Sequence, residues 1–99
     1  MKYTVHYAAA ARVDIKRLYA YLLERDELTA KRALAVIENG MKILADFPFS
    51  CRKASPENSF LRELVIPFGS AGYVLLFEIG DAESVTILAV RHQREDDYH

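Results

Sequence analysis

The sequence has no tryptophan and only a single cysteine, Cys51, among its 99 residues. One thiol cannot form an internal disulfide, and Cys51 has no Cys or His partner at a spacing typical of zinc ligands. The chain must therefore fold through a hydrophobic core. Its length allows this, because a domain of about this size buries roughly 60 to 65% of the surface that its unfolded chain exposes. A lone thiol also fits a reducing compartment.

Neither sign of charge is in excess, and long apolar runs are missing. Thirteen Lys and Arg against 14 Asp and Glu give a formal net charge of -1, which argues against a protein that grips nucleic acid through bulk charge. No apolar run approaches the roughly 20 residues that span a bilayer, and no signal-peptide pattern is present. We therefore expect a single domain over residues 1–99, in the cytoplasm, without membrane contact, metal or organic cofactor.

Three runs rich in β-branched and aromatic residues occupy the last third of the chain. They cover residues 61–66, 72–79 and 85–92, and the connections 67–71 and 80–84 carry Gly, Pro, Ser and Asp. Apolar runs of strand length between such turn residues are typical of hairpins. The pattern predicts a three-stranded antiparallel meander.

Both faces of this meander are predicted to be apolar. Because side chains alternate between faces, the middle strand has one row of Tyr73, Leu75, Phe77 and Ile79 and another of Val74 and Leu76. The last strand repeats this, with Val85, Ile87 and Ala89 opposite Leu88 and Val90. An antiparallel sheet with one wet face alternates apolar and polar residues. Both faces therefore need a cover, one from the chain itself and the other from a partner.

A first strand is predicted at residues 2–7, followed by two amphipathic helices. The first helix opens at Ala8–Ala11 without an N-cap residue, and its apolar stripe consists of Ala11, Ile15, Leu18 and Leu22. Thr29 is the expected N-cap of the second helix, which stops at Phe47–Pro48. Two helices with a short break form an antiparallel hairpin, which we expect to cover one sheet face.

Two further features complete the α+β prediction. Gly40 lies inside the second helix, where glycine costs about 1 kcal/mol relative to alanine, and this indicates close approach of a neighbouring backbone. Residues 49–59 are expected to form one long irregular loop that carries Arg52 and Lys53. Cys51 lies in this loop without a base at a recognisable spacing, so we interpret it as a bystander rather than a nucleophile.

Ionisable side chains gather in the C-terminal run from Arg91 to His99. Arg91 and His92 point to opposite faces of their strand, and Arg62 and Arg94 are candidates for the same rim. Such a group can bind phosphate and, with His92, Tyr98 or His99, act on RNA by general acid–base chemistry. The alternative from the residues alone is that the arginines pair with sheet carboxylates such as Glu63 and Glu78.

Several segments resemble the RelE/ParE superfamily of bacterial toxins. They are Ala-Arg-x-Asp-Ile at 11–15, Tyr-x-Tyr-Leu at 19–22, Leu-x-x-Phe-Pro at 44–48, Leu-Arg-Glu-Leu at 61–64, and the ending Val-Arg-His-x-Arg at 90–94. The resemblance covers nearly the whole chain. It implies a cytoplasmic bacterial toxin in a hetero-oligomer with a cognate antitoxin, which supplies the missing cover and itself contacts operator DNA.

The superfamily has two activities, and the resemblance is closer to the ParE branch. ParE-type members inhibit DNA gyrase by protein contact without chemistry of their own, and the acidic run Glu95 to Asp97 suits this better than phosphate binding. Arg62, Arg91, His92 and Arg94 are then the expected target-contact residues. The alternative is a RelE-type, ribosome-dependent mRNA endonuclease that uses His92, Tyr98, His99 and Arg62. A weakly toxic co-repressor and a degenerate structural module are readings from other classes.

Overall fold

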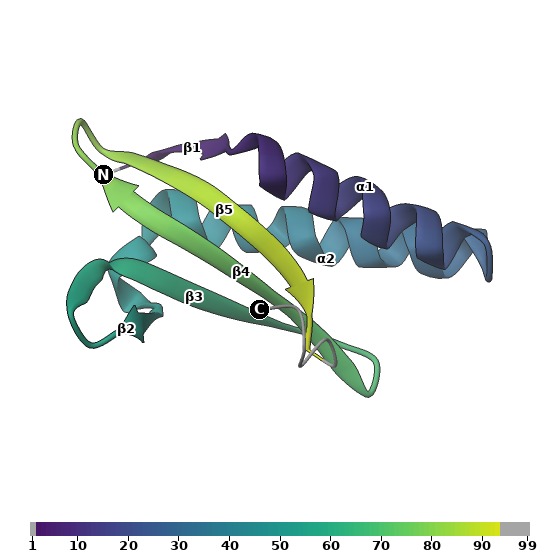
Figure 1. Ribbon diagram of the computed structural model, residues 1–99. Coiled ribbons are helices and arrows are strands. Elements are labelled where there is room, and N and C mark those ends of the chain that lie inside the picture. Colours follow the sequence, from purple (N-terminus) through teal and green to yellow (C-terminus); the bar gives the residue numbers. More distant parts are fainter. Residues whose placement is uncertain (1, 94–99) are drawn as a thin grey trace.

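The computed structural model describes residues 2–93 as one mixed sheet with two long helices on one of its faces (Figure 1). The sheet has five strands in the order β1-β5-β4-β3-β2. This confirms the predicted α+β class. In chain order the elements are β1 (Thr4–Tyr7), α1 (Ala9–Leu23), α2 (Glu27–Asp46), the 3₁₀ turn η1 (Pro48–Ser50), β2 (Arg52–Ser55), β3 (Asn58–Phe68), β4 (Ala71–Gly80) and β5 (Ser84–His92).

The predicted meander is present as β3, β4 and β5, each antiparallel to the next. The sequence left the place of the first strand open. In the structure β1 runs parallel to β5 at the sheet edge, with Val5 opposite Val85. A parallel partner is possible here because the helical hairpin and three further strands separate β1 from β5 along the chain, which leaves room for the crossover.

The prediction of one irregular loop over residues 49–59 is wrong. This segment contains η1 and the short strand β2, which pairs antiparallel with β3 and places Arg52 opposite Glu63. The Arg52 Nε donates to Glu63 Oε1 at 3.0 Å. The strand escaped detection because it is only four residues long, polar and followed by Pro56. Short, charged strands of this kind are typical of sheet edges.

Both helices form where the apolar stripes predicted them, but the cap of α2 differs. Ala8 occupies the N-cap position of α1, in agreement with the absence of a capping residue from the sequence. At α2 the N-cap is Asp26 rather than Thr29. Its carboxylate accepts hydrogen bonds from the Leu28 amide and the Thr29 hydroxyl, so Thr29 supports the cap from inside the first turn.

The core lies between the hairpin and the covered sheet face. On the sheet side its centre is the predicted row of Tyr73, Leu75, Phe77 and Ile79, all buried. Gly40 of α2 packs against β3, and a Cβ there would lie 2.6 Å from Ile66 Cδ1 and 3.3 Å from Leu64 Cδ2. The close approach inferred from Gly40 is therefore present, but the neighbouring atoms belong to side chains of β3 and not to its backbone.

An irregularity in β5 changes which of its side chains face the core. The register shifts between Leu76 and Phe77, which lie opposite Ala89 and Ile87, so that Leu88 is the extra residue of a β-bulge. Val85, Ile87 and Val90 are consequently buried, and Ala89 is not. The predicted grouping of Ala89 with Val85 and Ile87 is therefore wrong, because strict alternation fails at a bulge.

Among the described residues, no helix is long and apolar enough to cross a membrane.

Candidate functional site

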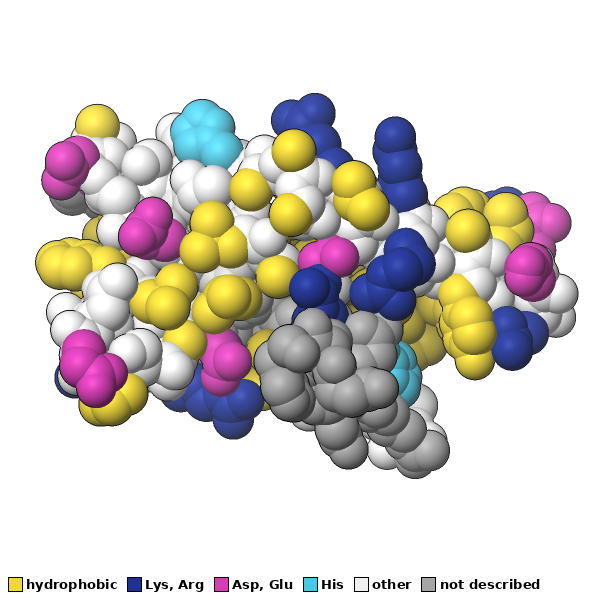
Figure 2. All heavy atoms as spheres, viewed as in Figure 1, with side chains coloured by type: hydrophobic (Ala, Val, Ile, Leu, Met, Phe, Trp, Pro, Cys, Tyr) yellow, Lys and Arg dark blue, Asp and Glu magenta, His cyan; other side chains and the backbone are white. Residues whose placement is uncertain are grey.

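The sheet face opposite the helices carries an apolar patch. Val74 and Leu76 of β4 lie on it with their register partners Val65 and Ala89, and all four side chains are only half-buried. Figure 2 looks onto this face and shows hydrophobic side chains gathered over the strands. We call this set, Val65, Val74, Leu76 and Ala89, the open-face patch. The sequence predicted its apolar character from Val74 and Leu76.

Charged side chains border the open-face patch. Glu63 lies opposite Leu76, and Glu78 lies opposite Leu61 and Thr86 on the same face. Glu63 is paired with Arg52 of β2, whereas the alternative from the residues alone named Arg62 and Arg91 as partners of the sheet carboxylates. The border of the patch therefore carries both signs of charge, with the Arg52–Glu63 ion pair on one side and the Glu78 carboxylate on the other.

Arg91 lies at the outer edge of β5, where it meets helix α1. The bulge places it on the side of Val74, its register partner in β4. Its guanidinium forms an ion pair with Asp14 of α1 and also donates to the Val90 carbonyl at 3.3 Å. The Asp14 carboxylate in turn accepts the Val90 amide at 2.9 Å. Arg91 is therefore held by helix α1 of its own chain.

Arg62 has a different role from that expected of a surface cation. Its side chain is half-buried beneath η1, and its guanidinium donates to the carbonyl oxygens of Ser59 at 2.6 Å, Phe49 at 3.1 Å and Cys51 at 2.9 Å. It also lies over the Phe49 ring, 5.3 Å from the centroid. These contacts tie η1 and the start of β2 to the sheet.

His92 faces the helix side of the sheet, opposite Arg91, as predicted. It lies beside Tyr73 with 5.5 Å between the ring centroids in an edge-on arrangement. Burial raises the pKa of Tyr73. The Tyr73 hydroxyl therefore stays protonated near neutral pH, and it is unsuited to act as a general base for a neighbouring substrate.

The structure brings together only part of the predicted cluster. Arg62 pairs with Phe77 on the helix side, whereas Arg91 pairs with Val74 on the open side, three positions away along β4. The two arginines thus lie on opposite faces. Arg94, Tyr98 and His99 lie outside the described residues. Within residues 2–93, no group of three or more His, Cys, Asp or Glu side chains is placed to hold a metal ion.

Asp14 is the site residue that sequence reasoning missed. It lies within the apolar stripe of α1, three residues after Ala11 and four before Leu18, and all three side chains are buried. A carboxylate at such a spacing predicts a buried polar contact, and this signal was present in the sequence. Its partners, 76 and 77 residues away, were not.

Cys51 gives no sign of a nucleophilic role. Its side chain is buried, and burial raises the pKa of the thiol despite opposing contributions from Ser50 and Arg62. A thiol that stays protonated and shielded is a poor nucleophile. This agrees with its interpretation as a bystander.

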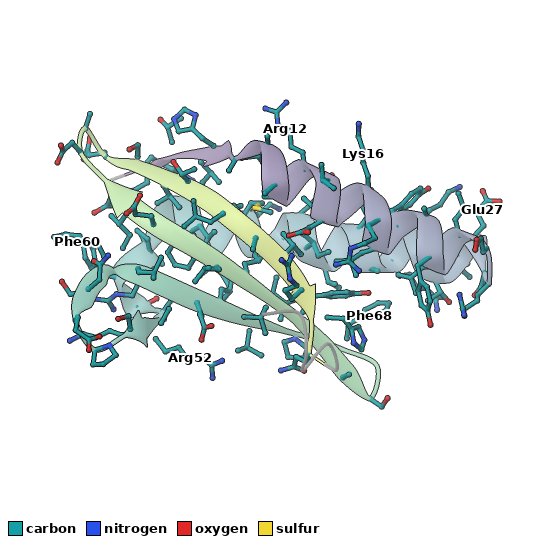
Figure 3. The ribbon with its side chains drawn as sticks, in the orientation of Figure 1. Arg12, Lys16, Glu27, Arg52, Phe60 and Phe68 are labelled. Carbon is teal, nitrogen blue, oxygen red and sulfur yellow. The ribbon has the colours of Figure 1, made fainter. Side chains whose placement is uncertain are left out.

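A hollow lies on the other side of the molecule, between the two helices and the end of β1. Arg12 and Lys16 of α1 lie at the border of this hollow, and their side chains point away from the sheet (Figure 3). Burial and the nearby Glu38 carboxylate raise the pKa of Tyr7, which also contributes to the hollow. Its walls are formed by Tyr7, Arg12, Ile15, Lys16, Leu34, Ile37 and Glu38.

Two solved structures share this fold. A chain of the chromosomal ParDE TA system from P. aeruginosa matches with a TM-score of 0.73 at 15% identity, covering 92% of this chain and 96% of that one. The toxin-antitoxin complex RelBE2 from Mycobacterium tuberculosis contains a chain that matches with a TM-score of 0.62 at 26% identity, covering 93% and 99%.

Sequence relatives extend over the same length. Toxin RelE1 of Caulobacter vibrioides is 33% identical over 87 residues, which is 87% of this chain and 90% of the relative. Toxin RelE3 of the same organism is 33% identical over 92 residues, covering 93% and 96%. A sequence profile described as the ParE toxin of the type II toxin-antitoxin system parDE matches residues 5–97. The chain therefore belongs to the ParE toxin family within the RelE/ParE superfamily of type II toxins.

Proposed function

We propose that this toxin inhibits DNA gyrase by direct protein contact and that a cognate antitoxin neutralises it. The observation that carries the proposal is the set of contacts made by Arg62 and Arg91. Arg62 donates to three backbone carbonyl oxygens, and Arg91 is paired with Asp14. Both cations are directed at acceptors within the toxin and not at a common pocket.

RNA cleavage would demand a different arrangement. The reaction needs a proton donor, a proton acceptor and a cation for the charge of the phosphorane, all around one phosphate. Here Arg62 and His92 face the helix side of the sheet, while Arg91 lies on the open side and is paired with Asp14. A protein partner needs no such convergence, and an apolar face with a charged border suits it.

The antitoxin is assigned to the open-face patch. The helical hairpin covers only the other face of the sheet, and apolar surface of this kind marks protein interaction sites. The two structural relatives are components of toxin-antitoxin systems, one of them solved as the complex. We therefore expect a hetero-oligomer in the bacterial cytoplasm, in which the antitoxin supplies the contact with operator DNA.

The alternative function is ribosome-dependent mRNA cleavage. It is favoured by the names of the two curated relatives, Toxin RelE1 and Toxin RelE3, which share 33% identity with this chain. The side chains available for it are His92, Tyr98, His99 and Arg62. Of these, Tyr98 and His99 lie outside the described residues.

A supercoiling assay distinguishes the two functions. Purified gyrase is titrated with the toxin alone and with the toxin preincubated with its antitoxin, and both supercoiling and DNA cleavage are measured. We expect inhibition that the antitoxin relieves. A parallel reaction contains translating ribosomes and a defined mRNA. Cut mRNA together with unaffected gyrase would replace the proposal with the ribonuclease alternative, and His92, Tyr98 and His99 would then be the first residues to substitute.

A further inference from the structure

Asp14 is the only charged side chain that is buried among residues 2–93, with 8% of its surface exposed. Burying a carboxylate is costly unless the charge is paired and hydrogen-bonded. An apolar residue at this point of the stripe would avoid that cost, but it would leave the buried Val90 amide without its acceptor. A buried ion pair restricts the orientation of both of its side chains, because the pair is maintained in one geometry only.

Asp14 makes its contacts at the point along β5 where β1 ends and helix α1 takes its place beside the strand. Strand β1 pairs with β5 only as far as Tyr7 opposite Ile87, and the chain then turns into α1. Beyond this point, Asp14 accepts the Val90 amide and Arg91 donates to the Val90 carbonyl. The two side chains are also paired with each other. Together they occupy the positions that the backbone of a longer β1 would fill.

These contacts, together with one from β4, hold the end of β5. Val90 and Arg91 are close to the end of β5 at His92, and the next amide, that of Gln93, donates to the Gly72 carbonyl at 2.8 Å. The end of β5 is thus held on both sides. Helix α1 holds it through Asp14, and β4 holds it through the Gly72 carbonyl.

We infer that Asp14 is a positioning residue for toxicity, acting through Arg91 to fix the end of β5, where the expected target-contact residues Arg91 and His92 lie. The inference rests on the proposed function and on the expectation from the sequence that Arg91 and His92 belong to the surface that contacts the target. It assigns Asp14 no contact with the target itself. Loss of the Asp14 charge releases Arg91 and the end of β5, so potency falls even in a toxin that stays folded.

The test is a double-mutant cycle between Asp14→Asn and Arg91→Ala. Asparagine keeps an oxygen for the Val90 amide but cannot form the ion pair. The matched control is Asp46→Asn, which removes the exposed ion pair between Asp46 and Lys2, 2.9 Å apart in the native chain. Potency is measured as growth arrest after induction without antitoxin and as the half-inhibitory concentration on gyrase. Thermal melting by circular dichroism identifies temperatures at which each variant is folded.

We expect Asp14→Asn to lower potency by about tenfold or more, the size of effect that loss of one central interface contact produces, while the control stays within about twofold. In the Arg91→Ala background, Asp14→Asn should add almost nothing, because the two residues act as one unit. Independent effects of the two substitutions, or full potency of a folded Asp14→Asn toxin, would overturn the inference.

Two outcomes keep this inference separate from the proposed function. If the native toxin arrests growth without affecting gyrase, the proposed target is wrong, and the same cycle measured by growth arrest still decides the role of Asp14. If Asp14→Asn does not fold, Asp14→Glu takes its place, since it keeps the charge but displaces Arg91 by about one methylene. Full potency of that variant would count against positioning, and reduced potency with native-like melting would support it.

Discussion

Arginine is the residue at which the chemistry of this protein is decided. Its planar guanidinium offers five donors, which suits phosphate recognition and equally suits the satisfaction of several carbonyl oxygens. Arg62 uses this capacity inward, on Ser59, Phe49 and Cys51. A loss of toxicity after substitution of Arg62 would therefore report on folding before it reports on target contact.

Replacement of Arg62 by Ala should destabilise the toxin by about 2 kcal/mol, because carbonyl groups beneath η1 lose their donors. Arg62→Lys should restore little of this, since one ammonium cannot reproduce the fork of donors. The control is Arg52→Ala, which breaks an exposed ion pair with Glu63 and should cost less than about 1 kcal/mol. Urea unfolding measures all three variants, and equal stability of the Arg62→Ala and Arg52→Ala proteins would contradict the structural role.

The sequence indicated that Arg62 and Arg91 are important, but it did not indicate which groups they contact. Arg62 and Arg91 stood out through their motifs, yet their acceptors are backbone carbonyls of a turn and a carboxylate 77 residues away along the chain. Such partners depend on the packing of α1 and η1 against the sheet. Period and spacing within one element carry no information about that packing.

At the scale of elements, helix α2 begins at a cap that should be sensitive to pH. The hydrogen bond from the Thr29 hydroxyl, followed by the backbone amides of Leu28 and Thr29, lowers the pKa of Asp26 below its ordinary value of 3.8. A carboxyl group whose pKa is lower in the fold stabilises the fold at neutral pH, and this contribution disappears as pH falls through the folded pKa.

Asp26→Ala should accordingly lower the melting temperature at neutral pH, because α2 loses the acceptor of its first turn. The difference from the native protein should shrink as the pH falls below 3.8 and the native carboxylate also becomes protonated. Thermal melts of both proteins across this range provide the measurement. A difference that stayed constant down to the lowest pH would exclude the carboxylate as its source.

Helix α2 also depends on Gly40 for its contact with β3. Gly40→Ala gains about 1 kcal/mol of helix propensity, but its Cβ would meet Ile66 Cδ1 at 2.6 Å, and overpacking a core typically costs about 1 to 3 kcal/mol. We expect a net loss of stability. Ile66→Val removes the clashing methyl, so the double variant should be more stable than the sum of the single effects predicts. Additive effects in a urea-unfolding cycle would show that this contact does not explain the glycine.

The elements themselves were largely predictable, and the exceptions have physical reasons. Hydrophobic period and turn residues located the helical hairpin and the meander. They missed β2, whose four residues have no apolar alternation, and the bulge at Leu88, which strict alternation cannot represent. The bulge matters most for function, because it turns Val90 inward and places Arg91 on the open side of the sheet.

At the scale of the whole molecule, the chain covers one face of its sheet and leaves the other apolar. The helical hairpin, the buried row of β4 and the small residue Gly40 together complete a core on the covered side. The open-face patch has no counterpart within residues 2–93 that could bury it. A toxin that is held inactive by a partner requires such a surface, and this links the asymmetry of the fold to the expected antitoxin complex.

Leu76→Lys tests this link, because Leu76 lies in the middle strand and at the centre of the open-face patch. A charge buried under the antitoxin should weaken the complex by about 30-fold or more, the effect of losing an interface hot spot. The control is Leu28→Lys, which adds the same charge at the tip of the helical hairpin, beside Glu27 and far from the patch (Figure 3). Calorimetric titration with the antitoxin gives both affinities, and thermal melts show whether each variant is folded. If Leu76→Lys bound as tightly as Leu28→Lys, the antitoxin would have to cover another surface, and the apolar open face would need a different explanation.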